Sequence, residues 1–345
     1  MRPDAKNGSP LTKTRSSGRC KTADVQEIRY TIRQLQHFVA VADAGSISRA
    51  VDLTHTSQPG ISLSVSELER GIGVKLFVRQ RTKGMSLTPA GTDFLTFARE
   101  LLSSAEILQS RMDTERGSLS GRLPIGCYFT LEALLLTPLI ADFHDEAPGI
   151  ALDVQDGTQP ELERGLREGA TELAIMYDDH LAADLTSIVI DIVRPYVLLA
   201  PDHRLAGEEQ VSLVDLADEP MILFDSAPSS QNWEAALSRI GIEPRVSMRS
   251  RNFEFVRCLV GRGLGYGFLM QRPVSDITYE GTRVVPKVIQ EPMPTTSVVL
   301  AYLRGAPLSP RAQRFIEFAV QERSESLLHT HGDPARRRPP PVVTG

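Results

Sequence analysis

The hydrophobic pattern near the start of the chain predicts three short helices in succession. Apolar residues recur every three or four positions within 32–42, 47–51 and 61–72, and this spacing gathers them on one face of each helix. Ser46 and Ser57 stand where the second and third helices would begin, and serine hydroxyls commonly cap such ends. The short turn between the last two helices makes a helix-turn-helix arrangement.

The third helix and the segment after it carry polar groups suited to DNA. The helix start offers hydroxyl and amide groups that can hydrogen-bond base edges in a major groove. Two helices of an ordinary bundle would show the same apolar spacing, so the basic hairpin turn at 78–84, which can reach phosphates, favours the DNA reading. We expect DNA contacts from Thr56, Ser57, Gln58, Pro59, Ser62 and Leu63 in the helix and from Arg79, Arg81 and Lys83 in this wing.

Charge is distributed unevenly along the chain. Residues 30–90 hold seven Lys and Arg against four Asp and Glu, a balance of +3, whereas residues 131–192 hold fourteen acids against two arginines. The formal net charge of −5 argues against a protein that coats nucleic acid. A mildly basic head on an acidic body indicates local DNA contact.

A long helix is predicted after the wing. Its apolar residues alternate in spacings of four and three, which is the heptad pattern of a coiled coil. Because only a small unit precedes this helix, we expect its seam to pack on a second chain and so to form a dimer. The seam consists of Phe94, Ala98, Leu101, Ala105, Leu108 and Met112.

Beyond a Gly and Ser linker at 117–121, predicted strands and helices alternate. Repeated strand-helix units imply a largely parallel sheet with covering helices. Two such lobes, with the last strand and helix returning to the first, leave a cleft of the kind that binds small ligands. The predicted organisation is a multidomain α/β chain with an extension (1–29), a winged helix-turn-helix domain (30–91), a linker helix (92–116), a two-lobed α/β domain (121–321) and a tail (322–345).

Other protein classes leave weaker marks in the sequence. The glycines of 261–267 run from a helix into a strand, the reverse of the order that a dinucleotide loop requires. Ser226 lacks the Gly-x-Ser-x-Gly elbow of a hydrolase and suits a helix cap. The histidines are scattered, and we expect His37 and His55 at the surface or in a turn. We therefore predict no enzyme activity, no cofactor and no metal.

The three cysteines are widely separated and support neither a disulfide framework nor a metal site. A redox-responsive regulator that joins Cys127 and Cys258 across the cleft is one alternative, and a cytoplasmic small-molecule binding protein is another. The longest apolar run is far shorter than the roughly 20 residues of a membrane span. We therefore expect a cytoplasmic protein without membrane contact.

The segment 46–91 resembles the winged helix-turn-helix of LysR-type transcriptional regulators. The resemblance extends over residues 30–321, because the linker helix and the two-lobed body also match that family's architecture. Thr54 stands where the family usually has an apolar residue. Leu63 and Ser64 stand where many members have a basic or amide residue, so the base preference of other members cannot be transferred to this chain. The motifs that carry the resemblance are Ser57-Gln58-Pro59 followed by Ser62, Leu68-Glu69, Gly73-Val74 with Leu76-Phe77, and Leu87-Thr88-Pro89-Ala90-Gly91.

The resemblance implies a homo-oligomer, commonly a tetramer built from two dimers, that binds double-stranded promoter DNA. RNA polymerase is a further expected partner. The body would resemble periplasmic binding proteins and take a small-molecule effector between its lobes, through loops that follow the strands. The positions that match those loops include Thr130, Asp156, Thr158, Tyr177, Asp178, Ser226, Arg249, Arg251 and Phe253.

Overall fold

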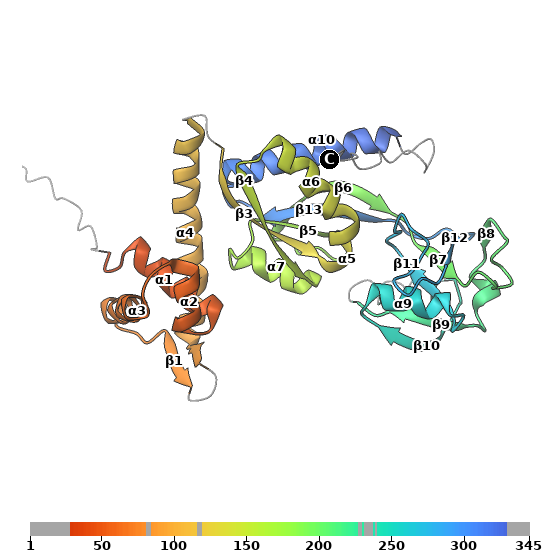
Figure 1. The fold of residues 1–345 in the computed structure, drawn as a ribbon, viewed down its shortest axis with the longest axis horizontal. Coiled ribbons are helices and arrows are strands. Elements are labelled where there is room, and N and C mark those ends of the chain that lie inside the picture. Colours follow the sequence, from red (N-terminus) through yellow and green to blue (C-terminus); the bar gives the residue numbers. More distant parts are fainter. Residues whose placement is uncertain are drawn as a thin grey trace, which may run out of the picture.

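The computed structural model describes residues 28–80, 84–115, 119–226, 230, 237–238 and 240–329. These residues form a helical head, a long helix and two α/β lobes (Figure 1), which is the fold class expected from the sequence. The wing residues Arg81 and Lys83 lie outside the described residues. Within the described ranges, no helix combines the length and the apolar character needed to cross a membrane.

The head contains three helices whose ends follow from local interactions. Thr31, Ser46 and Ser57 each accept a backbone hydrogen bond at a helix start. Gly45 ends the first helix with a φ of 64° and His55 ends the second with a φ of 50°, so His55 lies in a turn, as predicted. The helices are α1 (Ile32–Ala44), α2 (Ile47–Thr54) and α3 (Gln58–Ile72).

One apolar core joins these helices. The ring of Phe38 is fully buried, with its centroid 5.1 Å from that of Phe94 and 5.2 Å from that of Phe77. His37 is 5% exposed, which corrects the surface position expected for it, because α1 packs against both α3 and α4. Burial, with a smaller contribution from Arg33, lowers the pKa of His37 and favours its neutral ring. The core also contains Leu35, Val41, Ala50, Ile61, Val65, Leu68 and Leu76.

The wing is an antiparallel hairpin of β1 (Phe77–Gln80) and β2 (Gly84–Leu87). Gly84 has a φ of 81°, and a side chain there would meet the carbonyl oxygen of Gly45 at 2.7 Å. The amide of Met85 donates to that same oxygen over 2.9 Å. The hairpin is therefore held closely against the turn that precedes α2.

The long helix α4 (Pro89–Glu115) begins in the head and extends beyond it (Figure 1). Thr88 caps it by accepting a hydrogen bond from the amide of Gly91 over 2.9 Å. A side chain at position 91 would lie 2.1 Å from the carbonyl oxygen of Leu76. This close approach explains why the Thr-Pro-Ala-Gly motif ends in glycine.

The predicted seam of α4 divides into two parts. Phe94 packs on Phe38, and Ala98 is 1% exposed within the head's own core. This corrects their assignment to a dimer seam, because α4 runs along α1 there. Further along α4, Ala105 is half-buried. The remaining seam residues are exposed, at 44% for Leu101, 64% for Leu108 and 52% for Met112, and Phe97 is 64% exposed beside them.

Lobe 1 is a five-stranded sheet with the strand order β4-β3-β5-β13-β6. β3 pairs in parallel with β4 and β5, whereas β13 pairs antiparallel with β5 and β6. The sheet is thus mixed rather than largely parallel, because the chain leaves this lobe through β6, which the sequence pattern missed, and returns through β13. The strands are β3 (Gly121–Tyr128), β4 (Ile150–Gly157), β5 (Leu173–Tyr177), β6 (Leu185–Val193) and β13 (Thr296–Leu303).

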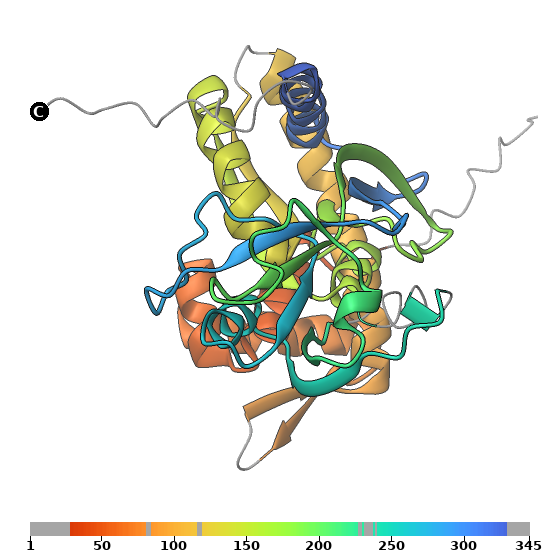
Figure 2. The same cartoon turned by 90° about the vertical axis from the view of Figure 1, so that its right-hand side faces the viewer.

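Helices cover both faces of the lobe 1 sheet (Figure 1). α6 and α10 lie together on one face (Figure 2), where the ring of Phe143 lies 5.0 Å from that of Phe315. The chain after β3 contains a π-helical segment at 132–136, and the closing helix continues past residue 321, where a tail was predicted. The elements are α5 (Phe129–Leu131), the π-helix η1 (Glu132–Leu136), α6 (Thr137–Glu146), α7 (Gln159–Arg167) and α10 (Pro310–His329).

Lobe 2 is a six-stranded mixed sheet with the order β10-β9-β11-β7-β12-β8. Alternate residues of β7 face opposite sides: Val197 belongs to one apolar cluster, whereas Leu198 packs with Val256 and Val260 of α9. The short β8 and the strand β12 were not predicted. The elements are β7 (Tyr196–Leu199), β8 (Gln210–Val211), the 3-10 helix η2 (Val214–Leu216), β9 (Pro220–Phe224), β10 (Arg245–Ser250), α9 (Phe253–Gly261), β11 (Tyr266–Leu269) and β12 (Val285–Ile289).

Candidate functional site

Polar and apolar side chains of the first turns of α3 extend into solvent. Gln58 and Pro59 are exposed and Leu63 is 58% exposed. On the opposite side of the helix, Ile61 and Val65 are buried in the head core. The outward side chains are therefore presented without being needed for packing.

The hydroxyl groups near the start of α3 have local roles as well. Ser57 Oγ accepts the amide hydrogen of Gly60 over 3.3 Å, and Thr56 Oγ1 donates to the carbonyl oxygen of Thr54 over 3.1 Å. Ser62 is half-buried. Because a serine hydroxyl can donate and accept at once, Ser57 can cap the helix and still donate to a DNA acceptor.

Glu69 connects the end of α3 to the wing. It is 7% exposed, and its carboxylate accepts hydrogen bonds from the amides of Leu76 (2.9 Å) and Phe77 (3.2 Å). Lys75 Nζ lies 2.5 Å from its other oxygen. Burial alone would raise the pKa of Glu69, but these hydrogen bonds outweigh burial and lower it. Glu69 thus fixes the start of β1, the strand that contains Arg79.

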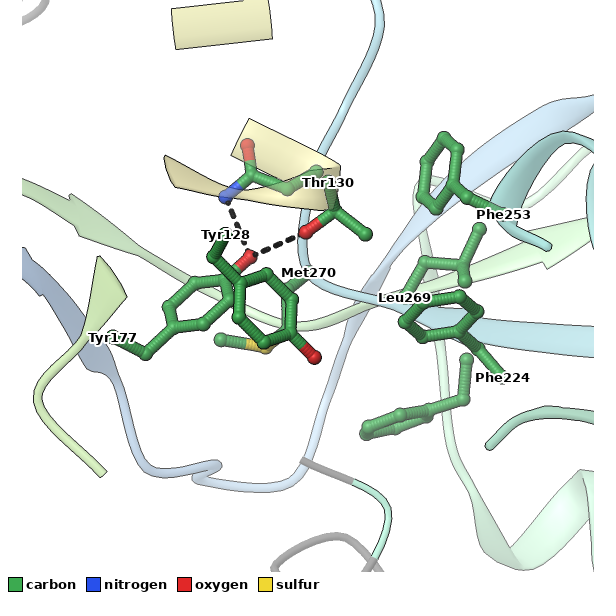
Figure 3. Close-up of a pocket in the computed structure, with 9 residues that line it drawn as sticks. Tyr128, Thr130, Tyr177, Phe224, Phe253, Leu269 and Met270 are labelled. Carbon is green, nitrogen blue, oxygen red and sulfur yellow. Dashed lines mark hydrogen bonds between the residues drawn. The ribbon is translucent and has the colours of Figure 1, made fainter. Parts of the chain in front are cut away.

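The cleft between the lobes forms where parallel strands end. In lobe 1, β3 ends at Tyr128 and β5 at Tyr177, and in lobe 2, β9 ends at Phe224 and β11 at Leu269. Figure 3 shows the two tyrosines together, with Phe224 and Phe253 across the pocket from them. The cavity is small, at about 20 Å³. Its described lining consists of Tyr128, Thr130, Tyr177, Phe224, Phe253, Phe268, Leu269, Met270 and Gln271.

Hydrogen bonds cross this cleft at two places. Gln271 Nε2 of lobe 2 donates to the hydroxyl oxygen of Tyr177 over 3.1 Å, and that hydroxyl lies 3.3 Å from Thr130 Oγ1 (Figure 3). The hydroxyl groups of Tyr128 and Ser226 also share a hydrogen bond between the lobes. Burial raises the pKa of Tyr177, so its phenol is neutral at physiological pH.

The structure brings together only part of the predicted effector set. Thr130, Tyr177 and Phe253 line the cleft, and Ser226 joins it through Tyr128. The aromatic and amide residues of the lining were missed, because apolar residues within strands look like ordinary core. Their position at the carboxyl ends of the predicted strands was the available signal.

The other predicted effector residues have different partners. Asp178 accepts the amide hydrogen of Ser297 over 3.0 Å, because β5 pairs with β13 there. Thr158 begins α7 and donates to Glu161 over 2.6 Å. Exposed Arg249 lies 3.8 Å from Asp225. Asp156 and Arg251 are also exposed, and neither they nor the preceding three belong to the described lining of the cleft.

The cysteine alternative has little support from the geometry. Both Cys127 and Cys258 are free thiols. Cys127 is fully buried, and burial, with smaller effects of Glu132 and Asp156, raises its pKa. A thiol with a raised pKa is a poor nucleophile, so Cys127 is better explained as a core residue.

A second and much wider groove, of about 1010 Å³, lies between α4 and lobe 1. Arg99 of α4 crosses it, 2.5 Å from Asp43 of α1 and 3.4 Å from Glu168 after α7. Arg122 pairs with Asp153 over 2.5 Å on the lobe side. The described walls hold five arginines and five acidic residues, so their charges largely neutralise one another. This groove is therefore an ion-paired contact between head and lobe.

Comparison with known proteins decides the family. The model of the bacterial regulatory helix-turn-helix protein, lysR family, matches residues 32–92, and the model of the LysR substrate binding domain matches residues 116–324. The chain belongs to the LysR family of transcriptional regulators. Its helix-turn-helix head is the DNA-binding part of such a regulator, and its two-lobed body is the effector-binding part.

Three relatives of this LysR-family chain match it over nearly their whole length. The RuBisCO operon transcriptional regulator of Allochromatium vinosum is 30% identical over 294 residues, which cover 85% of this chain and 96% of the relative. The crystal structure of HinK from Pseudomonas aeruginosa, a LysR family transcriptional regulator, shares 38% identity with a TM-score of 0.58 and covers 85% of this chain and 98% of HinK. Full-length CbnR complexed with its target DNA is similar in fold, with 22% identity, a TM-score of 0.59 and coverage of 85% and 99%.

Proposed function

We propose that this LysR-family regulator reads its promoter with Gln58, Ser62 and Leu63, while Ser57 and the wing hold the DNA backbone. The observation that carries the proposal is the outward display of Gln58 and Leu63 on a helix whose other face is buried. A glutamine side chain can pair with adenine in the major groove, and a leucine can contact a thymine methyl group. The fold shared with the CbnR–DNA complex supports this use of the head.

We further propose that two chains pair through the outward stripe of α4. Phe97, Leu101, Leu108 and Met112 follow one another at four, seven and four residues, which places them on one face of the helix. An exposed apolar stripe of this length is typical of a subunit interface. Pairing would place two copies of α3 on successive major grooves of a pseudo-palindromic site.

In the same proposal the cleft holds a small-molecule effector, and the regulator acts by binding rather than by catalysis. Ligand entry would change the relation of the lobes, and Arg99 would carry that change to the head through Asp43. Regulation then depends on a ligand that favours one arrangement of the oligomer over another. Contact with RNA polymerase and location in the cytoplasm stay predictions.

The reading role of Gln58 is tested by selecting bound sequences from a random DNA pool and measuring their affinity. Gln58→Ala should weaken binding to the selected site by about 1–3 kcal/mol, with little change for random DNA. Gln36→Ala, which removes an exposed glutamine of α1, is the matched control. An unchanged ratio of selected to random affinity in Gln58→Ala would remove this role.

The pairing role of α4 is tested separately by light scattering. Leu101→Glu should lower the mass of the oligomer, because it places a charge in the proposed apolar interface. Gln109→Glu adds a similar charge at another exposed position of α4 and should leave the mass unchanged. An unaltered mass in Leu101→Glu would show that the chains pair elsewhere.

A further inference from the structure

The described lining of the cleft is neutral and mainly aromatic. Five of its nine residues are Tyr or Phe, and none is Asp, Glu, Lys, Arg or His. The exposed Arg249 has Asp225 as its neighbour at 3.8 Å. An anionic ligand in this cavity would therefore lose its hydration without gaining a cationic side chain from the described lining.

The aromatic rings form a continuous chain from one lobe to the other. The ring of Tyr128 lies 5.1 Å from that of Tyr177 and 4.7 Å from that of Phe129. Phe129 in turn lies 6.1 Å from Phe224 of lobe 2, and Phe224 lies 6.1 Å from Phe253. These spacings suit offset and edge-to-face packing of rings. A flat ligand ring could take part in the same packing.

The polar groups of the cleft are few and lie close together. Gln271 Nε2 can only donate, so the hydroxyl oxygen of Tyr177 accepts from it, and the hydroxyl groups of Tyr177 and Thr130 share a second hydrogen bond in which either can be the donor. A ligand that carries both a donor and an acceptor could replace these partners, as an amide or a hydroxyl group can. A carboxylate could only accept.

The size of the cavity limits the shape of the ligand. About 20 Å³ is room for roughly one water molecule between the described residues, so we expect a larger molecule to part the lobes. Parting them breaks the hydrogen bonds of Tyr128 with Ser226 and of Tyr177 with Gln271, which join opposite lobes. A planar ring requires the smallest separation for its surface area.

We propose that the effector of this regulator is a small, uncharged, planar ring compound with an amide or hydroxyl group. Its ring would lie among Tyr128, Phe224 and Phe253, and its polar group would replace the bond between Gln271 and Tyr177. This class of ligand deepens the proposed function and rests on the assignment of the cleft as the effector site.

The test uses the full chain and a pair of nearly isosteric probes, benzamide and benzoate, in calorimetric titrations at neutral pH. Benzamide should bind at least about tenfold more tightly, because benzoate must bury a charge without a cation. Cyclohexanecarboxamide, which keeps the amide but is not planar, should bind more weakly than benzamide. Tighter binding of benzoate, or no binding of either aromatic probe, overturns the proposed class.

Two variants separate this outcome from a failure of the site itself. Tyr177→Phe should weaken benzamide about two- to tenfold through the loss of one hydrogen bond, and Phe224→Leu should weaken it through the loss of a ring contact. Tyr279→Phe, at a side chain 90% exposed, is the control. If benzoate binds tightly and Tyr177→Phe changes its affinity, the proposal of an uncharged ligand is wrong but the assignment of the cleft as the effector site is kept. If benzamide binds and neither cleft variant alters its affinity, the ring lies elsewhere and the cleft assignment fails with it.

Discussion

Helix α3 and the cleft hold their candidate functional side chains in opposite ways. Gln58 and Leu63 extend from α3 into solvent while the other face of the helix is buried. Tyr128 and Tyr177 are 0% and 3% exposed, and their hydroxyl groups are bonded to groups of the opposite lobe. The side chains proposed to read DNA are therefore already exposed, whereas the proposed ligand would have to replace bonds that the cleft already makes.

In the head, different residues are therefore expected to determine DNA binding and stability. In the cleft, the same residues are expected to determine both ligand binding and stability. A side chain that faces solvent contributes little to folding, so its replacement should change only recognition. A buried wall residue contributes to both. We therefore expect the free energy of unfolding to fall most for substitutions in the cleft wall and least for substitutions on the exposed face of α3.

Phe268→Ala should cause the largest loss of stability. Phe268 lines the cleft, is 2% exposed and belongs to a core cluster of lobe 2. Truncation of such a phenylalanine costs about 3–5 kcal/mol. The measurement is urea unfolding, with Phe255→Ala, at a ring 52% exposed in the same lobe, as the control. A loss below about 1 kcal/mol would mean that the cleft wall is not part of the folding core.

Tyr177→Phe should cost about 1–3 kcal/mol in the same unfolding measurement, because it leaves the buried amide of Gln271 without its acceptor. The shape of the ring is unchanged, so the loss reports on the hydroxyl group alone. Tyr279→Phe should leave stability unchanged. Equal stability of the two variants would indicate that the bond between the lobes contributes nothing to the closed cleft.

The sequence predicted the head better than the cleft for a physical reason. Caps at Ser46 and Ser57 and the apolar spacing of α3 are local signals, which neighbouring residues determine. The cleft depends on side chains that come from strands far apart in the sequence, such as Tyr177 and Gln271. Its position at the end of a predicted strand was enough to identify Tyr177 as a cleft residue. The same signal also suggested Asp178, but the carboxylate of Asp178 accepts a hydrogen bond from the amide of Ser297 instead.

Glu69 is the exception in the head, because it is a buried polar group with partners six to eight residues away. Its lowered pKa means that the folded state favours the carboxylate more than the unfolded state does. The resulting stability is present above the ordinary value of 4.5 and is lost as the pH falls below it. Position alone on an amphipathic helix does not reveal such a role.

Glu69→Gln should therefore lower the free energy of unfolding at neutral pH by an amount on the order of 1 kcal/mol, and the melting temperature should fall with it. The difference from the unmodified protein should shrink as the pH falls below the ordinary value of 4.5 and through the lowered pKa of Glu69, since the carboxylate then becomes protonated. Glu67→Gln, at an exposed position of the same helix, is the control. A difference that stays constant with pH would exclude the ionised carboxylate as the source of the stability.

Leu63→Ala should have the smallest effect on folding, within about 0.5 kcal/mol, because the side chain is 58% exposed. Its effect on binding to the selected DNA site should be about 0.8 kcal/mol if Leu63 contacts one thymine methyl group. Uracil in place of that thymine removes the same methyl group from the DNA side. Leu63→Ala and the uracil site should each weaken binding when introduced alone. The Leu63→Ala protein on the uracil site should bind no more weakly than with either change alone. The control Leu53→Ala, at an exposed leucine of α2, should leave binding to both DNA sites unchanged. Additive losses would mean that leucine and methyl group do not touch, and an unfolding loss well above 0.5 kcal/mol would show that the reading face is not independent of the core.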